Sequence, residues 1–267
     1  MDGNAEVRPI LDIVELTKFF GGLCAVKGFS MALPAGALWG LIGPNGAGKT
    51  TVFNLITGVI PPSSGSIHLP EERIDGLEAH EITRLGIART FQNIRLFSNL
   101  SVLDNVRIAY HAHADYGLSD SLLRTRRFLD KERELTEQAL DFLAIFKLDA
   151  IAEETARNLP YGEQRRVEIA RALACNPKVL LLDEPAAGMN PREIIQLMDL
   201  IHFIRDRFRL SIILIEHQMR VVMGICERIT VMDFGEVIAR GTPREIQNDA
   251  RVVEAYLGKG MAGRVAG

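Results

Sequence analysis

The sequence of 267 residues contains only three cysteines, and they stand far apart. Cys24, Cys175 and Cys226 form neither a C-x-x-C pair nor the set that a disulfide framework needs. We therefore expect three separate small thiols, each buried or partly buried in the protein.

Long hydrophobic runs are also missing. The longest runs, at 179–183 and 211–217, fall well short of the roughly 20 residues that a helix needs to cross a bilayer. The start of the chain, MDGNAEVRPI, lacks the basic residues and the apolar stretch of a secretory signal. We therefore expect a cytoplasmic protein, which could act at a membrane only through a partner.

The chain has no large excess of charge of either sign. Its 31 lysines and arginines and 34 acidic residues leave a formal net charge of −3, which gives no whole-chain electrostatic reason to expect nucleic acid as a partner. Basic residues do cluster locally, but they alternate with acids and predict a solvated helix face: Arg124, Arg126, Arg127, Lys131 and Arg133. No lasting heptad pattern and no internal repeat is evident.

Against this background one glycine-rich stretch stands out, GLIGPNGAGKT at residues 40–50. The residues before it are apolar, and those after it could continue as a helix, so the glycines lie at a strand-to-helix turn. Residues 43–50 match the pattern G-x-x-x-x-G-K-T of a phosphate-binding loop, in the structural context that such a loop requires. The sequence therefore predicts a binding site for a nucleoside triphosphate.

The residue types in this loop suit that chemistry. Glycines let the backbone curl, so that successive N–H groups can point at phosphate oxygens from the start of a helix. Lys49 supplies a positive charge to the β- and γ-phosphates, and the Thr50 hydroxyl suits a Mg²⁺ ion that keeps several of its waters. The residues expected to bind nucleotide here are Gly43, Pro44, Asn45, Gly46, Ala47, Gly48, Lys49, Thr50 and Thr51.

Strand-like and helix-like segments follow one another in an order that predicts an α/β fold. Segments rich in β-branched residues, separated by turn signals, predict strands near 11–16, 28–33, 38–42 and 66–69. Helical spacing from about 101 to 159 predicts a helical insert. Beyond it, KVLLLDE and SIILIEH predict buried parallel strands joined by the helix PREIIQLMDLIHFIRDRF. The tail ERITVMDFGEVIARG predicts a hairpin that turns near Phe234 and Gly235, followed by a short helix at TPREIQND.

Both buried strands end in residues that could hydrolyse a bound nucleotide. Asp183 is placed to bind Mg²⁺ indirectly, and Glu184 next to it can polarise a water molecule. His217 ends the other strand, where a neutral imidazole could contact the γ-phosphate and orient that water. A histidine in this position is often only structural, but its company with Lys49 and Asp183 favours a catalytic role.

The stretch LPYGEQRRVEIARAL, residues 159–173, resembles the signature sequence of the ATP-binding cassette (ABC) family. Together with GPNGAGKT, ARTFQN, LLLDEP and LIEH, the resemblance spans nearly the whole chain. It implies a P-loop NTPase core with a mixed or parallel sheet, an N-terminal antiparallel β subdomain and an inserted α-helical subdomain. All of these would form a single ABC ATPase domain over 1–267, with the nucleotide-binding core at 1–92 and 160–267 and the helical subdomain at about 93–159.

The resemblance also implies roles for further residues. Gln92 would sense Mg²⁺ and the membrane partner, and Phe20 in KFFGG would stack on adenine. Phe19 is the rival for that stacking role, and burial of Phe20 in the core is the alternative. In a pair of cassettes that sandwiches two ATP molecules, the partner's signature helix would complete each site, with contacts from Tyr161, Gly162 and Glu163.

The signature departs from the usual family pattern, which begins Leu-Ser-Gly-Gly. Pro160 stands where the serine would bond the γ-phosphate, and it offers neither a hydroxyl nor an N–H. Tyr161 replaces the first glycine. Gly162 and the start of the following helix remain, and their amides and dipole still favour an anion. Asn190 likewise stands where the family usually has aspartate.

The motifs YGEQRR and DEPAAGMNP and the ending GTPREIQND…VVEAYLG resemble the ATPase subunits of branched-chain amino acid importers. This resemblance implies ATP and Mg²⁺ as cofactors and a location on the inner face of the cell membrane. Its partners would be transmembrane permease subunits, a second ABC ATPase subunit in a homo- or heterodimer and, indirectly, a periplasmic or extracellular substrate-binding protein. No nucleic acid partner is expected.

Other members of the same family provide the alternatives. A lipopolysaccharide-export ATPase has a similar ending and a similar RRVEIARAL segment. A soluble ABC ATPase of DNA repair or ribosome work is less favoured, because the sequence has no long coiled coil and no second cassette.

The segment after Gln92 offers a candidate contact with the membrane subunits. Ser101 could cap a helix that has Asp104 in its first turn. Leu96 and Phe97 just before it either belong to the core of the insert or form part of a cleft that receives a helix of the membrane subunit.

Overall fold

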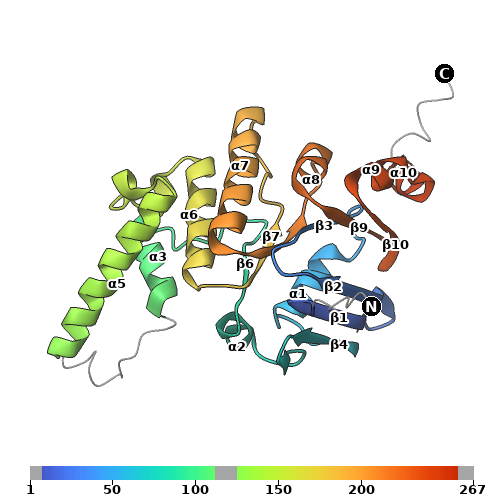
Figure 1. Ribbon diagram of the computed structural model, residues 1–267, viewed down its shortest axis with the longest axis horizontal. Helices are drawn as coiled ribbons and strands as arrows, with labels where there is room; N and C mark the ends of the chain where they lie inside the picture. Colours follow the sequence, from blue (N-terminus) through green and yellow to red (C-terminus); the bar gives the residue numbers. More distant parts are fainter. Residues whose placement is uncertain (1–7, 112–124, 258–267) are drawn as a thin grey trace, which may run out of the picture. The chain divides into compact units, whose positions relative to one another are not determined.

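The computed structural model describes residues 8–111 and 125–257. The described residues form two compact units, one consisting of the chain up to Arg89 and from Lys178 onward, the other of Thr90–Pro177. In Figure 1 the first unit carries the blue and the orange-red ends of the chain, and the second carries the green and yellow helices.

The first unit begins with an antiparallel sheet in the order β2-β1-β4-β5. Its strands are β1 (Leu11–Phe20), β2 (Leu23–Leu33), β4 (Ser64–Leu69) and β5 (Glu72–Arg73). β1 and β2 form a tight hairpin that pairs Phe20 with Leu23, and a bulge in β1 leaves Glu15 at a φ of 49°. The antiparallel β subdomain is therefore confirmed, with longer strands than the sequence predicts.

The second sheet of this unit has the order β10-β9-β3-β8-β7-β6. Its strands are β3 (Leu38–Ile42), β6 (Ile87–Arg89), β7 (Val179–Asp183), β8 (Ser211–Ile215), β9 (Arg228–Asp233) and β10 (Glu236–Gly241). The strands β6, β7, β8, β3 and β9 run parallel, and β10 returns antiparallel at the edge. β7 and β8 are buried along their whole length, as expected of apolar strands covered on both faces. The predicted mixed sheet and βαβ unit are confirmed.

The described helices of this unit include the three that were predicted, after the glycine-rich loop, between the two buried strands and after the C-terminal hairpin, together with three that were not predicted. They are α1 (Lys49–Ile56), α2 (Ala79–Arg84), α7 (Pro191–Phe208), α8 (Met219–Ile225), α9 (Pro243–Asn248) and α10 (Ala250–Leu257). Asn190 caps α7 by accepting bonds from the N–H groups of Arg192 and Glu193, so an amide here does the capping work of an aspartate. Figure 1 shows α7 and α8 side by side along the core sheet.

The core of the first unit holds α1 in place. Buried apolar side chains from both sheets surround this helix, including Ile13, Phe29, Leu181 and Ile213, and Phe53 of α1 is itself completely buried. Since α1 follows the glycine-rich loop directly, the hydrophobic core fixes the position of that loop.

The second unit is helical. It contains α3 (Val102–His111), α5 (Arg126–Ile145), the short helices η1 (Asp149–Ile151) and η2 (Ala156–Asn158), and α6 (Tyr161–Ala174). The backbone N–H of Asp104 donates to the Ser101 hydroxyl at 3.0 Å, which confirms the predicted cap. The unit extends beyond the predicted insert of 93–159, because α6 packs against α3 and α5 and thus belongs with them.

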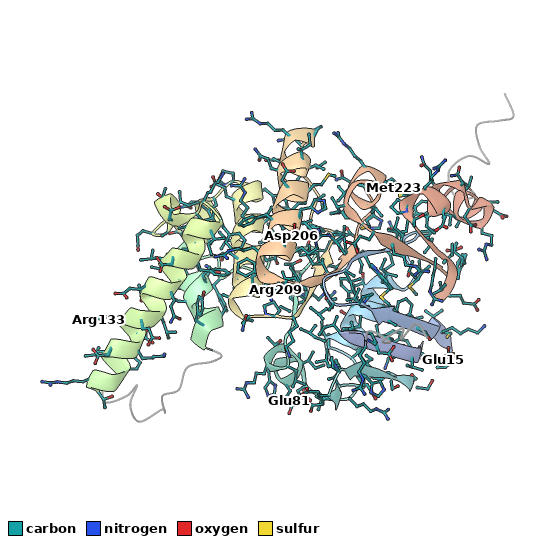
Figure 2. The ribbon with its side chains drawn as sticks, viewed as in Figure 1. Glu15, Glu81, Arg133, Asp206, Arg209 and Met223 are labelled. Carbon is teal, nitrogen blue, oxygen red and sulfur yellow. The ribbon has the colours of Figure 1, made fainter. Side chains whose placement is uncertain are left out.

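Charged residues cover the outer face of α5. Arg133 projects from this helix and is exposed (Figure 2). Leu135 and Ala139, by contrast, are buried. Lys131 forms an ion pair with Glu134 at 2.9 Å. The predicted solvated helix face is confirmed for Arg126 and Arg133, which are exposed, and for Lys131, which is partly exposed, whereas Arg124 and the side chain of Arg127 lie outside the described residues.

The cysteines are separate, as expected: Cys24 and Cys175 are partly buried and Cys226 is buried. Burial raises the pKa of the Cys226 thiol to about 12. Within the described ranges, no helix combines the length and the hydrophobicity that crossing a membrane requires.

Candidate active site

The glycine-rich loop connects β3 to α1 and is shaped by close backbone contacts. A side chain at Gly43 would place its Cβ 2.0 Å from the carbonyl oxygen of Met232, and one at Gly48 would place it 2.4 Å from that of Ala25. Both glycines have positive φ angles, 151° and 100°. Only glycine fits these positions, and the resulting loop leaves its backbone open to a ligand, as a phosphate cradle requires.

The β9–β10 hairpin supports this loop, a contact that the sequence did not reveal. The N–H of Gly235 donates to the carbonyl of Ala47 at 3.1 Å, and the Gly235 carbonyl accepts from the N–H of Lys27 at 2.9 Å. The hairpin turn therefore holds the loop against β2. The predicted turn at Phe234 and Gly235 is confirmed, and its tertiary role comes from the fold.

Lys49 lies inside the loop. Its side chain is buried, and Nζ donates to the carbonyls of Gly43 at 2.8 Å and Pro44 at 3.0 Å. Burial lowers the pKa of Lys49, while the nearby carboxylates of Glu184 and Asp183 oppose that shift. An ammonium held among acceptors at the centre of an open backbone cradle suits the oxygens of a triphosphate, so this loop fits a nucleotide.

Glu184 and His217 come together at the carboxyl ends of the neighbouring strands β7 and β8. Nε2 of His217 lies 2.5 Å from Oε1 of Glu184. Glu184 adopts a φ of 48°, unusual for a residue with a side chain, and its N–H donates to Ile215 at 2.8 Å. Backbone conformations of this kind tend to occur at functional sites. The structure therefore brings together two residues that the sequence predicts to handle the attacking water.

Glu216, which precedes His217, was not identified from the sequence. Its buried carboxylate accepts from the N–H of Ala186 at 2.6 Å and from that of His217 at 3.1 Å. Burial raises the pKa of Glu216, and these N–H donors oppose the shift. Glu216 thus links the turn after β7 to the turn after β8. An acidic residue directly after an apolar strand was the available signal.

Asp183 is buried at the end of β7 and forms an ion pair with Arg89 of β6 at 2.6 Å. The same guanidinium donates to Oδ1 of Asn54 in α1 at 2.7 Å. Neither Arg89 nor Asn54 was a sequence-predicted site residue. A charged residue within the apolar segment GIARTF was the signal that could have found Arg89.

The surroundings suit a cation bound mainly through water and phosphate. Among residues 8–111 and 125–257, no cluster of three or more His, Cys, Asp or Glu side chains could hold a metal ion. Mg²⁺ in nucleotide sites uses one or two protein ligands, several waters and the phosphates themselves. Asp183 and the exposed residue Thr50, at the start of α1, are a donor set of this kind.

Both aromatic candidates for the adenine contact lie at the β1–β2 hairpin. Phe19 is 50% exposed and Phe20 is 49% exposed, so exposure does not separate them. The ammonium of Lys18 lies 5.3 Å from the centre of the Phe20 ring. The half exposure of Phe20 argues against the alternative that it is a plain core residue.

In the helical unit, the segment that contains Gln92 is anchored on α6. Arg165 is completely buried and donates to the carbonyls of Phe91 at 2.8 Å and Gln92 at 2.9 Å. Its ion pair with Glu168 measures 2.6 Å, and Glu168 also faces the N–H groups of Phe91 and Arg95. The Gln92 segment and the signature helix therefore form one connected structure, which the sequence did not predict.

The signature segment opens α6, as the sequence predicts. Pro160 occupies the N-cap position, and its carbonyl accepts from the N–H groups of Glu163 and Gln164. The Tyr161 hydroxyl accepts from Arg165 at 3.1 Å, so this side chain is engaged by its own helix. Glu163 lies in the first turn, beside Gly162. The start of α6 is thus a regular helix N-terminus, without the serine hydroxyl.

Phe97 follows the Gln92 segment and is 49% exposed, with the guanidinium of Arg171 5.7 Å from the centre of its ring. The completely buried Asn105 fixes this turn, accepting from the N–H of Phe97 at 2.9 Å and donating to its carbonyl at 3.1 Å. The interpretation of Phe97 as a core residue is therefore wrong, whereas Leu96 is half-buried.

Comparison with known proteins identifies the family. A model of the ABC transporter family matches residues 26–187, more than half of the chain. The chain belongs to the ABC transporter ATPases. A second model, described as a branched-chain amino acid ATP-binding cassette transporter, matches residues 236–262. This ABC chain is accordingly an ATP-hydrolysing transporter subunit.

Curated relatives of this ABC ATPase match it over nearly its whole length. The high-affinity branched-chain amino acid transport ATP-binding protein BraF of Pseudomonas aeruginosa is 44% identical over 94% of this chain and 99% of its own. LivG of Salmonella typhimurium, which carries the same description, is 45% identical with the same coverage. The lipopolysaccharide export system ATP-binding protein LptB of Escherichia coli is 36% identical over 91% of this chain and 95% of its own.

Solved structures confirm the ABC ATPase fold. MJ1267, an ATP-binding cassette of an ABC transporter in its ADP conformation, is 31% identical and covers 93% of this chain and 98% of its own, with a TM-score of 0.81. A nucleotide-free ATP-binding cassette from an ABC transporter is 30% identical, with a TM-score of 0.80 over 92% of this chain and 98% of its own.

Proposed function

We propose that this chain is the ATPase subunit of a branched-chain amino acid importer. Two comparisons support this substrate class: the 44% and 45% identity to BraF and LivG, and the match of residues 236–262 to the branched-chain amino acid cassette model. The observation that supports its chemistry is the meeting of Glu184 and His217 at the strand ends. The Glu184 carboxylate also opposes the lowering of the Lys49 pKa by burial.

Nucleotide binding would use the loop between β3 and α1. Its backbone N–H groups and Lys49 would hold the phosphates, and Thr50 and Asp183 would hold Mg²⁺, with Gln92 from the helical unit as a further ligand. Mg²⁺, when bound, neutralises charge on the phosphates and on the developing transition state. Phe20 would stack on the adenine ring, which its exposed position permits. The other proposed contacts in the loop are Gly43, Pro44, Asn45, Gly46, Ala47, Gly48 and Thr51.

Hydrolysis would depend on Glu184 as the group that polarises water. The hydrogen bond with His217 would orient this carboxylate. Glu216 would hold both turns in place, because its carboxylate accepts from the N–H groups of Ala186 and His217. Lys49 would stabilise negative charge that develops on the transferred phosphoryl group. A carboxylate that is oriented before the reaction has less to reorganise in the transition state.

The site would be completed by a second cassette, either another copy of this chain or a related one. The N-terminus of α6, with Tyr161, Gly162 and Glu163, would face the γ-phosphate bound by the partner. The regular helix start at Pro160 supports this proposal, because the amides of a helix N-terminus favour an anion even without a serine hydroxyl.

Transport would require transmembrane permease subunits, with this chain peripheral on the inner face of the cell membrane and a substrate-binding protein on the far side. The half-exposed Phe97 supports such a contact. Leu96, next to it, is half-buried and could line the same cleft.

Uptake measurements test the substrate class. In cells that lack this chain, we expect uptake of labelled leucine, isoleucine and valine to fall and to return with the wild-type chain but not with Glu184→Gln. Normal amino acid uptake together with a defect in lipopolysaccharide export would instead favour the function of LptB, which is less similar to this chain.

A further inference from the structure

Arg89 connects two elements of the proposed nucleotide site. It is the last residue of β6, and its guanidinium donates from Nη2 to Oδ2 of Asp183 at 2.6 Å and from Nη1 to Oδ1 of Asn54 at 2.7 Å. Asp183 ends β7, while Asn54 belongs to α1, the helix that begins with Lys49 and Thr50. One side chain thus bridges the strand that ends in Asp183 and the helix that carries Thr50, two of the proposed ligands of Mg²⁺.

The sheet register places Arg89 for this contact. Arg89 lies opposite Leu181 in the parallel pairing of β6 with β7. Asp183 is two residues further along β7, and residues two apart on a strand share a face. The long arginine side chain can therefore run along that face to the carboxylate. Phe53 of α1 covers the guanidinium, with its ring centre 5.4 Å away.

The pair is almost completely removed from solvent, since the side chains of Arg89 and Asp183 are 5% and 3% exposed. A buried ion pair is weak evidence for stability, because desolvation of both charges offsets their attraction. What burial does provide is orientation: a carboxylate fixed by a planar guanidinium, itself fixed by an amide and an aromatic ring, has little rotational freedom. That orientation matters at Asp183 because it is the expected carboxylate for the metal.

We infer that Arg89 is a positioning residue for Mg²⁺ binding: through its bridge to Asn54 it holds the Asp183 carboxylate at a fixed place relative to Thr50. The inference rests on the proposed function of the site. It concerns how the protein prepares that site, and it gives Arg89 no contact with the nucleotide.

The test measures how nucleotide binding depends on Mg²⁺. A fluorescent ATP analogue is titrated onto the full chain in EDTA and then at increasing Mg²⁺. We expect Arg89→Met to change the affinity measured in EDTA by less than about threefold, while the Mg²⁺ concentration at half-maximal effect rises about tenfold or more, in the range seen when residues that orient metal ligands are removed.

Two further variants separate geometry from charge. Arg89→Lys keeps the positive charge but lacks the planar fork, so we expect the Mg²⁺ requirement to rise here also. Asn54→Ala keeps both charges of the ion pair and removes only the anchor on α1, so it should raise the requirement by a smaller factor. In the Arg89→Met background, Asn54→Ala should add nothing, because both residues act through one bridge.

Arg73→Met is the matched control, since it removes the exposed arginine of β5 that pairs with the partly buried Asp75 at 2.8 Å, in the other sheet of the same unit. It should leave the Mg²⁺ dependence unchanged. Thermal unfolding without Mg²⁺ shows whether each variant is folded. If Arg89→Met does not fold, Asn54→Ala still tests the inference.

The outcomes distinguish the inference from the function on which it rests. A lower Mg²⁺ requirement in Arg89→Met would show that the guanidinium competes with the metal, and an unchanged requirement in both Arg89→Met and Asn54→Ala would show that the bridge is only structural. Either result overturns the inference. Failure of the wild-type chain to bind the analogue would instead overturn the proposed function.

Discussion

Glu184 and His217 form a hydrogen-bonded pair, with Oε1 and Nε2 2.5 Å apart. We expect Glu184→Gln to retain ATP binding and to reduce turnover by roughly 10²–10⁴-fold, because the amide cannot act as a general base. Steady-state hydrolysis and nucleotide binding should be measured together, and sedimentation should show an ATP-bound dimer. Hydrolysis at the native rate, with metal dependence retained, would show that another group polarises the water.

Lys49→Ala should act on a different step. The ammonium donates to Gly43 and Pro44 inside the loop, where it would meet the phosphates. Charge-assisted bonds contribute about 1.5–3 kcal/mol, so nucleotide affinity should fall by roughly ten- to a hundredfold. Isothermal titration measures this loss, and Lys131→Ala on α5 serves as a control that removes a lysine elsewhere. Equal affinity in Lys49→Ala and wild type would reject the phosphate role.

The start of α6 can be tested at two neighbouring positions. Pro160→Ser should be tolerated, because proline at a helix start is replaceable there and the backbone carbonyl contacts remain. Gly162→Asp should abolish ATP-driven dimerisation, because it brings bulk and negative charge to the proposed γ-phosphate contact. Equilibrium sedimentation with ATP, using the Glu184→Gln chain, measures this step. Full ATPase activity in the Gly162→Asp protein would contradict the proposal that two cassettes share the site.

Phe97→Ala tests the contact with the membrane subunits. Because Phe97 is 49% exposed, its truncation should lower the melting temperature of the isolated chain only slightly and leave basal ATPase activity nearly unchanged. Assembly with the permease subunits, followed by co-purification, should be weakened and transport lost. A large loss of thermal stability combined with normal assembly would exclude the docking role. Leu135→Ala on the buried side of α5 provides a comparison for a true core residue.

The Arg165–Glu168 pair predicts a non-additive effect on stability. Arg165→Leu should destabilise the chain by about 3–5 kcal/mol, because it leaves the buried Glu168 carboxylate without its partner. The double variant Arg165→Leu with Glu168→Leu should recover part of that loss, since it removes both charges. Denaturant unfolding of the double variant and of both single variants, Arg165→Leu and Glu168→Leu, measures the difference. If the double variant were as unstable as the sum of two single changes, the ion pair would not be the cause.

Local sequence was sufficient to predict the central elements of the fold. The predicted strand at 38–42 and the helix PREIIQLMDLIHFIRDRF have the observed bounds, because a short apolar run and a capped amphipathic segment are local signals. Three further features were found for the same reason, since each is a pattern of consecutive residues: the glycine-rich loop, the strand-end positions of Glu184 and His217, and the signature segment. Membership of the ABC family, inferred from those patterns, is confirmed.

Tertiary structure decided which residues support these motifs. Arg89 meets Asp183 across 94 positions of the chain, and Glu216 meets Ala186 across 30, so no local spacing could reveal either contact. Packing also placed α6 with the helical unit, since α6 packs against α3 and α5. The sequence by itself determined which residue types follow the two buried strands and which elements carry the proposed catalytic residues, because these depend on short-range backbone preferences. Only the folded chain determined how the carboxylates are held, because buried charges take partners from whichever strand or helix the topology brings beside them.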